Sequence, residues 1–344
     1  MLVIFSIVRP GILIICSSAH GGIDLGFQQT GRCWTVYANE FDSYPAATFQ
    51  ENFPIKVDLR DINKVKSADV PITDIIVGGF PCQAFSIAGL RQGFQDEKGR
   101  GELFFQLARI VNANRPEAAL FENVKNLVSH DDGRTFRIIC EELQNMGYHI
   151  EYKVLNAMKY GNVAQNRERI YIVAFQNEAA RQAFQWPEEI PLTNTVRDII
   201  DFEGNVPDRY YYTEGRFAGD IYEQLKEAME DDDIENPAIY QWRRKYVRKN
   251  QSGVIPTLTA NQGGGGHNVC LIKTRHGIRK MTPRECFTAQ GFDRDNFVLP
   301  EQSDTRLYKE AGNSVCVPVI RRIAEAMLQA LDNTGYVALE DRPR

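Results

Sequence analysis

The chain has 344 residues, enough for about two domains with a sizeable buried core. With 43% hydrophobic and 25% charged residues, the composition is that of a globular protein and excludes fibrous and disordered classes. The net charge of −5 is only a weak argument against a nucleic-acid partner, because binding needs a single basic face.

The beginning of the chain contains two apolar stretches, residues 1–8 and 12–16, which residues 9–11 interrupt. Neither approaches the roughly 18 residues of a membrane span, and no signal-peptide pattern is present. The seven cysteines are odd in number and lack metal-type spacing. We therefore expect a cytoplasmic protein without a membrane anchor, a disulfide framework or a metal.

Short apolar runs alternate with helix-like segments over the first half of the chain. The runs comprise residues 12–16, 35–38, 74–77, 118–121, 152–155 and 170–175. Between them, residues 103–111 and 134–146 have helical apolar spacing. This alternation predicts an α/β fold with βαβ units and a mostly parallel sheet.

Three chemically capable residues, Glu40, Cys82 and Glu122, each follow one of these runs. Ligands bind at the carboxyl ends of strands in such sheets, so the pattern predicts a site there. A lone cysteine is usually a small core residue. Here Pro81 stiffens the turn before Cys82, and the glycine-rich stretch 88–101 has the character of a lid, which favours a nucleophile.

The segment 165–169, with sequence Gln-Asn-Arg-Glu-Arg, directly precedes the run 170–175. Strand alternation places Arg167 and Arg169 on one face and Glu168 on the other. Two arginines on one face indicate recognition of an anion or a carbonyl, and they are candidates to ionise the Cys82 thiol. The alternative is a surface edge with solvated charges.

After residue 177 the pattern becomes irregular. We expect a smaller, irregular domain over residues 178–303, an amphipathic helix over 307–331, and a frayed tail over 332–344. An acidic run at 230–233 precedes a basic, aromatic run at 242–249. The basic run supplies phosphate contacts or is a solvated face, and the four glycines at 263–266 form a recognition loop or a simple hairpin turn.

Five motifs in this order resemble those of the bacterial C5-cytosine DNA methyltransferases of restriction–modification systems. They lie at residues 79–86 (Gly-Phe-Pro-Cys-Gln-Ala-Phe-Ser), 121–124 (Phe-Glu-Asn-Val), 165–169, 279–291 and 312–315 (Gly-Asn-Ser-Val). Each motif alone is weak, but the order extends over nearly the whole chain. The resemblance implies a Rossmann-like S-adenosylmethionine-dependent methyltransferase domain, residues 1–177 plus 304–331, and a target-recognition domain, residues 178–303.

The resemblance also implies roles for four catalytic residues. The Cys82 thiolate would attack C6 of a cytosine flipped out of duplex DNA, which activates C5 toward methyl transfer. Glu122 would contact N3 and the exocyclic amine. Arg167 would donate to O2, and Arg169 would support that geometry.

The same resemblance assigns binding residues. The site for S-adenosylmethionine would comprise Gly21, Gly22, Glu40, Asp61, Ile62, Pro81, Leu103, Asn313 and Ser314. Contacts to DNA would come from Ser86, Gln165, Arg243, Arg244, Thr257, Gly263 and Gly264. The implied partners are double-stranded DNA and a cognate restriction endonuclease of the same site, with the enzyme acting as a monomer.

The first cofactor motif departs from the family pattern Phe-x-Gly-x-Gly-Gly. Residues 17–22 read Ser-Ser-Ala-His-Gly-Gly, so Ser17 replaces the aromatic residue and Ala19 replaces the first glycine. A missing glycine hinders close approach of the backbone to the cofactor. We therefore predict weakened affinity for S-adenosylmethionine.

Three alternatives stay open at this level. A tRNA cytosine-5 methyltransferase shares the catalytic motifs, although the long region 178–278 favours duplex DNA. A catalytically impaired DNA-binding relative would fit the altered segment 17–20. A cysteine hydrolase is the weakest, because none of the five histidines lies in a motif that pairs with Cys82.

Overall fold

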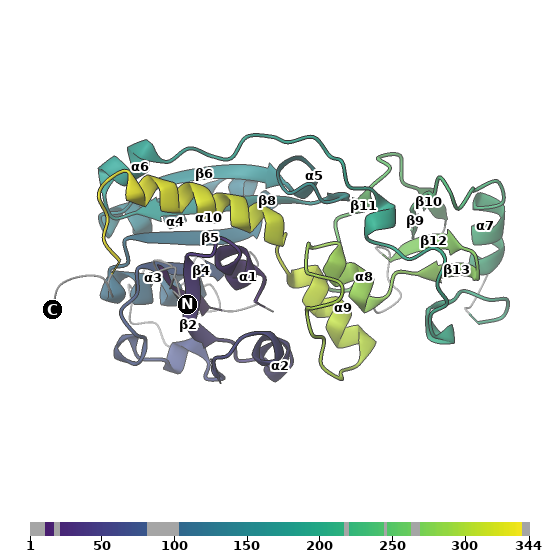
Figure 1. Cartoon of the computed structure of the whole chain (residues 1–344), viewed down its shortest axis with the longest axis horizontal. Helices are drawn as coiled ribbons and strands as arrows, with labels where there is room; N and C mark the ends of the chain where they lie inside the picture. The colour runs from purple at the N-terminus through teal and green to yellow at the C-terminus, as the bar shows by residue number, and fades with distance from the viewer. Residues whose placement is uncertain are drawn as a thin grey trace, which may run out of the picture. The chain divides into compact units, whose positions relative to one another are not determined.

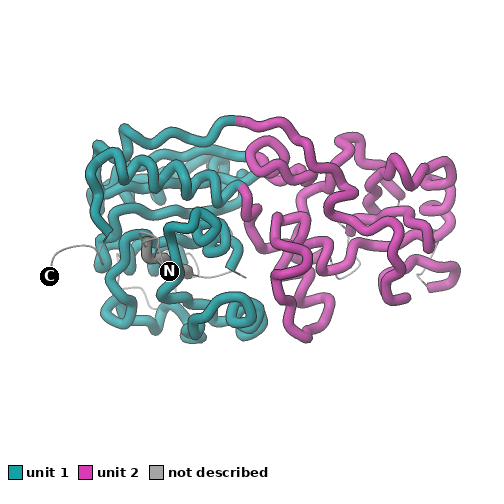
Figure 2. The backbone as a smooth tube through the Cα atoms, viewed as in Figure 1, with its two compact units in different colours: residues 1–155, 168–188, 319–344 teal, residues 156–167, 189–318 magenta. Residues whose placement is uncertain are grey.

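The computed structural model describes residues 21–80, 103–216, 220–243, 246–262 and 269–338, together with the backbone of residues 11–16. The chain forms two compact units (Figure 2). Unit 1 comprises residues 1–155, 168–188 and 319–344, and unit 2 comprises residues 156–167 and 189–318. These boundaries differ from those of the predicted domains, because residues 178–188 belong to unit 1 and residues 156–167 and 304–318 belong to unit 2.

Unit 1 is built on a seven-stranded sheet with the order β3-β2-β1-β4-β5-β8-β6. Its strands are β1 (Gly11–Cys16), β2 (Cys33–Asn39), β3 (Val57–Asp58), β4 (Ile75–Gly79), β5 (Ala118–Val124), β6 (His149–Asn156) and β8 (Glu168–Phe175). The pairs from β3 to β5 are parallel, and β8 runs antiparallel to β5. The predicted α/β class with a mostly parallel sheet is therefore confirmed.

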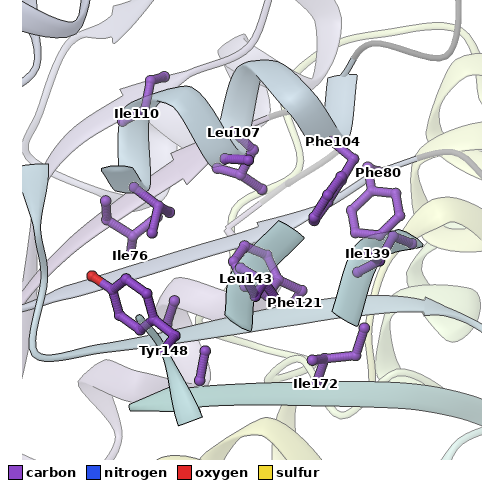
Figure 3. Packing of buried hydrophobic residues seen from close by; sticks show 14 of the residues in the cluster. Ile76, Phe80, Phe104, Leu107, Ile110, Phe121, Ile139, Leu143, Tyr148 and Ile172 are labelled. Carbon is purple, nitrogen blue, oxygen red and sulfur yellow. The ribbon is translucent and has the colours of Figure 1, made fainter. Parts of the chain in front are cut away.

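Helices lie on both faces of this sheet (Figure 1). They are α1 (Gly22–Gln28), α2 (Ser43–Asn52), α3 (Leu103–Asn114), α4 (Arg134–Asn145), α6 (Glu178–Ala183) and α10 (Val317–Asp332), with short 3-10 turns η1 (Ile62–Lys64), η2 (Ser67–Asp69) and η6 (Lys125–Ser129). One face packs against α3 and α4, where Leu107 and Leu143 meet Phe121 and Ile172 in a continuous core (Figure 3). Burial of such side chains contributes about 1.5–3 kcal/mol each.

The C-terminal part of the chain corrects one prediction. Residues 307–331 do not form a single helix, because the chain is interrupted at 314–316 between α9 (Asp304–Asn313) and α10. The expected apolar face of α10 is buried, and Ile320 packs against Gly26 of α1 so closely that a Cβ atom at Gly26 would lie 2.5 Å from its side chain. The described part of the predicted tail packs on unit 1, where the Tyr336 hydroxyl hydrogen-bonds Asp74.

Unit 2 contains regular structure that the sequence did not reveal. A four-stranded sheet has the order β10-β9-β12-β13, formed by β9 (Tyr240–Trp242), β10 (Val247–Lys249), β12 (Cys270–Thr274) and β13 (Gly277–Lys280). Its three strand pairs are antiparallel. Strands of three to five residues are too short to show a period, which is why the region read as irregular.

The described part of unit 2 also contains elements outside this sheet, among them the two-stranded sheet of β7 (Gln165–Asn166) and β11 (Ile255–Pro256). The others are α5 (Ala157–Tyr160), η7 (Val196–Asp198), η8 (Asp208–Tyr210), α7 (Ile221–Ala228), α8 (Pro283–Thr288) and α9. The acidic run after α7 is not simply solvated. Asp232 accepts hydrogen bonds from Tyr240 and Lys249, and Lys273 donates to its carbonyl. Among the described helices, none is long and apolar enough to cross a membrane.

A buried carboxyl in α1 makes the stability of unit 1 sensitive to pH. Asp24 is fully buried and accepts a hydrogen bond from the Thr35 hydroxyl at 2.6 Å. Burial raises the pKa of Asp24 to about 7. Because the folded-state pKa exceeds the unfolded value of about 3.9, folding stability falls as pH rises from about 4 to 7 and stays lower above it.

We expect Asp24→Asn to remove this penalty, since the amide oxygen still accepts from Thr35. At pH 8 the variant should be more stable than the parent by roughly 1–3 kcal/mol, and near pH 4.5 the two should be similar. Urea unfolding at both pH values measures the difference. An equal difference at the two pH values would show that the Asp24 carboxyl does not titrate during unfolding.

Candidate active site

The register of the central strands brings two predicted catalytic residues to one edge of the sheet. In the parallel pair β4–β5, Glu122 lies opposite Gly79. In the antiparallel pair β5–β8, Tyr171 lies opposite Glu122 and Arg169 opposite Val124. The carboxyl ends of β4 and β5 and the start of β8 therefore meet at the same place.

Glu122 and Arg169 form an ion pair at this edge. Oε1 of Glu122 lies 3.0 Å from Nε of Arg169, and each side chain is 12% exposed. A second donor of Arg169, Nη1, is hydrogen-bonded to the Glu168 carbonyl, which fixes the plane of the guanidinium. A carboxyl beside a planar cation, both reachable from solvent, can contact neighbouring polar atoms along the edge of a heterocyclic ring.

Asn123, whose sequence position suggested a cap of the next helix, instead holds the neighbouring chain in place. Its buried amide donates to the Phe80 carbonyl at 2.7 Å. Phe80 also packs against Phe104, with ring centroids 5.3 Å apart. The position of Phe80, two residues before Cys82, is thus fixed by β5 and α3. Pro81, Cys82 and Ser86 lie outside the described residues.

Three of the described cysteines have raised pKa values, which makes them poor nucleophiles. Burial raises the pKa of Cys140 to about 11 and that of Cys270 to about 12. It also raises the pKa of Cys286 well above its usual value. A thiolate is the reactive form, so a raised pKa disfavours reaction of these three thiols at neutral pH.

The end of β2 has features suited to a nucleoside. Glu40 is mostly buried, and its Oε1 accepts a hydrogen bond from the Asp42 backbone at 2.9 Å. The next residue, Phe41, is 70% exposed. A carboxylate can accept from ribose hydroxyls, and an exposed aromatic ring can stack on a base. The sequence analysis does not single out Phe41, although it directly follows Glu40.

The other described residues of unit 1 that were predicted to bind the cofactor lie at the starts of helices, at a helix cap or in the core. Gly21 caps α1 with φ +78°, and a Cβ atom there would lie 2.1 Å from the Phe53 ring, so this position requires glycine. Gly22 is the first residue of α1, and Leu103 that of α3. Asp61 caps η1 by accepting from Asn63, and the Ile62 side chain is part of the core.

The two arginines of the segment 165–169 have different partners. Arg167 belongs to unit 2 and is only 2% exposed. It donates to the carbonyls of Leu258 at 2.9 Å and Gly312 at 3.1 Å, and also to that of Ser314. Alternation along one continuous strand would place both arginines on one face, but the extended structure is interrupted at Arg167, between β7 and β8.

Predicted DNA-contacting residues of unit 2 differ in exposure. Gln165 is fully buried and donates to the Ala289 carbonyl. Thr257 is partly exposed, and its hydroxyl donates to the Asn166 carbonyl at 2.6 Å. Arg243 follows β9, and its backbone NH donates to Tyr246 at 2.8 Å in the hairpin turn. Arg244, Gly263 and Gly264 lie outside the described residues.

Asn313 and Ser314 follow each other at the end of α9. Asn313 is exposed, whereas Ser314 is 3% exposed. Within the described ranges the Ser314 hydroxyl has no hydrogen-bond partner. An orphaned buried hydroxyl fits a position that binds a polar ligand group. The described part of the chain contains no cluster of three His, Cys, Asp or Glu residues able to hold a metal ion.

Comparison with known proteins decides the family. The model of the C-5 cytosine-specific DNA methylases matches residues 16–329. The chain belongs to this family. It is 55% identical over 311 residues to the type II methyltransferase M.Bsp6I of Bacillus sp. (strain RFL6), covering 90% of this chain and 96% of that protein.

Further relatives extend this result. M.HhaI of Haemophilus parahaemolyticus, a type II methyltransferase, is 35% identical over 330 residues, covering 92% of this chain and 94% of that protein. The crystal structure of a Spodoptera frugiperda DNMT2 variant shares the fold, with a TM-score of 0.68 and 19% identity over 93% of this chain and 99% of that one. The methylase is thus a DNA cytosine-5 methyltransferase, and the methyl donor of its family is S-adenosylmethionine.

Proposed function

We propose that this methylase modifies one cytosine in a specific duplex site through a covalent bond between Cys82 and C6 of a flipped base. The observation that carries the proposal is the ion pair between Glu122 and Arg169. Strand β4 ends at the same edge of the sheet, with Gly79 opposite Glu122, and the chain reaches Pro81 and Cys82 shortly afterwards. The base must leave the helix because C6 is stacked inside the duplex.

The residues of the chain have distinct tasks in this reaction. The Cys82 thiolate forms a bond to C6, and Glu122 stabilises the added charge at N3 and the exocyclic amine. The contacts favour Arg169, rather than Arg167, as the donor to O2, because Arg169 is the arginine that lies beside Glu122. S-adenosylmethionine would supply the methyl group and leave as S-adenosylhomocysteine. C5 would then lose its proton to water, and the C5–C6 double bond would form again as the C6–sulfur bond breaks and releases the Cys82 thiolate.

The proposed binding of S-adenosylmethionine rests on two features that fit it. In unit 1, the Glu40 carboxylate and the exposed Phe41 ring suit a ribose and an adenine. In unit 2, the buried Ser314 hydroxyl is available for a polar group. Gly21, Gly22, Asp61, Ile62, Pro81, Leu103 and Asn313 remain assigned to the cofactor by resemblance.

The proposed biological role is protection of DNA from a restriction endonuclease of the same site, performed by a monomer. The support is that several relatives are type II methyltransferases. Contacts from Ser86, Arg243, Arg244, Thr257, Gly263 and Gly264 to DNA are part of this proposal. The buried Gln165 would act by holding the backbone of Leu258, next to Thr257, and not by touching a base.

The direct test uses duplexes of mixed sequence that contain 5-fluorocytosine. Fluorine at C5 blocks the final loss of a proton, so the enzyme should remain bound to the methylated base. A denaturing gel and mass spectrometry should show a complex through Cys82 that carries one methyl group. Methylation of ordinary cytosine without any trapped complex would contradict the covalent route.

The altered first motif gives a separate prediction. We expect the double substitution Ser17→Phe and Ala19→Gly to tighten binding of S-adenosylmethionine by about tenfold or more, since the backbone can then approach the ligand and an aromatic ring packs beside it. Isothermal titration calorimetry of both proteins measures the change. Ordinary micromolar affinity of the unmodified protein would contradict the proposed defect.

A further inference from the structure

Three distant segments of the chain meet inside unit 2. Strand β7 pairs in parallel with β11, so Gln165 lies opposite Ile255 and Asn166 opposite Pro256. The segment 257–260, which contains the proposed DNA contact Thr257, continues directly from β11. The turn 312–314, which contains the proposed cofactor residues, ends α9.

The last two segments touch through their backbones. A Cβ atom at Gly312 would lie 2.2 Å from the Thr259 carbonyl carbon and 2.4 Å from the Ala260 nitrogen. No side chain separates them at this point, so a displacement of one segment displaces the other. The segment 257–260 and the turn 312–314 therefore form one packed junction.

Arg167 holds this junction from both sides. Nη1 donates to the Leu258 carbonyl, while Nη2 donates to the carbonyls of Gly312 and Ser314. The guanidinium is planar and rigid, so its two ends cannot follow independent movements of the two segments. Because the side chain is 2% exposed, water does not readily replace a lost bond.

Two glutamines complete the connection. Oε1 of Gln165 accepts from the Leu258 backbone at 3.2 Å, and its Nε2 donates to the Ala289 carbonyl. Gln290 donates to the Ala311 carbonyl at 2.9 Å and accepts from the Val317 backbone at 2.8 Å through its own carbonyl. Both ends of the 312–314 turn are thereby tied to the residues that support Leu258.

We propose that Arg167 is a positioning residue that couples the binding of DNA at the segment 257–260 to the binding of S-adenosylmethionine at the turn 312–314. The inference rests on the proposed function, which places the two ligands at these segments. A ligand that orders one segment fixes the Arg167 guanidinium, which in turn orders the carbonyls of the other segment. The second ligand therefore binds to a segment that is already ordered. Such coupling is reciprocal in free energy.

The test measures the affinity for S-adenosylhomocysteine, the demethylated product of the methyl donor, with and without a reversibly bound duplex that has the sequence of the trapped one but ordinary cytosine. In the unmodified protein, duplex should tighten binding by at least about fivefold, and S-adenosylhomocysteine should tighten duplex binding by the same factor. Arg167→Lys keeps the charge but cannot span both sets of carbonyls, so both ratios should fall below about twofold. The matched control Arg169→Lys should retain the ratios and lose single-turnover rate.

A measurement on the unmodified protein covers the case in which Arg167→Lys does not fold. Hydrogen exchange should show that S-adenosylhomocysteine alone protects backbone amides of residues 258–262, and that duplex alone protects those of 314–317. The inference would be overturned if Arg167→Lys left both affinity ratios unchanged. It would also be overturned if neither ligand protected the amides of the segment that binds the other ligand. If neither ligand binds the unmodified protein, the proposed function itself fails.

Discussion

Replacing Cys82 by alanine should abolish methyl transfer while leaving duplex binding nearly intact. The thiolate supplies the bond that makes C5 nucleophilic, and the methyl side chain of alanine cannot form such a bond. Loss of a covalent nucleophile lowers rates by roughly four to six orders of magnitude. Single-turnover assays with tritiated S-adenosylmethionine should therefore show no product above background, and gel shifts should show a duplex affinity close to that of the parent.

Cys140→Ala provides the matched control. Cys140 is half-buried in α4, and burial raises the pKa of its thiol to about 11, so its removal should not change the rate. The same assay compares the two variants. Residual transfer by Cys82→Ala within a factor of about 100 of the parent would exclude Cys82 as the nucleophile, because such a modest loss is typical of removing an auxiliary group.

Arg279→Met should destabilise unit 2 by about 3–5 kcal/mol, because it leaves a buried carboxylate without its cation. Arg279 is fully buried and binds both oxygens of Glu285, at 2.7 and 2.8 Å. It also donates to the Asp201 carbonyl at 2.6 Å. The same carboxylate caps α8 by accepting from the Thr282 backbone at 2.7 Å. One substitution therefore affects the sheet, the helix and the loop at Asp201.

The comparison variant is Arg275→Met on the same hairpin. Arg275 pairs with Glu203 at 2.8 Å, but its side chain is 63% exposed, so its loss should change stability by less than about 1 kcal/mol. Urea unfolding, followed by hydrogen exchange of the β13 and α8 amides, separates the two cases. Similar behaviour of both variants would show that the buried pair does not stabilise unit 2.

Much of unit 1 could be predicted from the sequence because its central strands β4, β5 and β8 are mostly buried. Such strands appear as continuous apolar runs, and 118–121 and 170–175 were located within a few residues of β5 and β8. The antiparallel direction of β8 was not predictable, since no local pattern encodes direction. The interruption between α9 and α10 was missed because the apolar spacing continues through Val315 and Val317, although the helix ends at Asn313.

The candidate site was predictable in composition but not in contacts. The position of Glu122 after an apolar run indicated the sheet edge, and the structure places Arg169 beside it. Strand alternation predicted that Arg167 lies on the same face as Arg169. The hydrogen-bond partners of Arg167 are instead the carbonyls of residues 258, 312 and 314. Those carbonyls are 91 to 147 residues away along the chain, and no local pattern in the sequence identifies them.

The division of the chain between the two units has a consequence for biosynthesis. Helix α10, which packs against α1, comes from the end of the chain, whereas all residues of unit 2 precede residue 319. During translation, unit 2 is therefore complete before unit 1, although unit 1 begins the chain. At about 5–20 residues per second, the first 155 residues wait roughly 10–30 s for α10. Apolar surface on the α10 side of the sheet is exposed during this interval, so nascent chains should depend on chaperones more than the finished enzyme does.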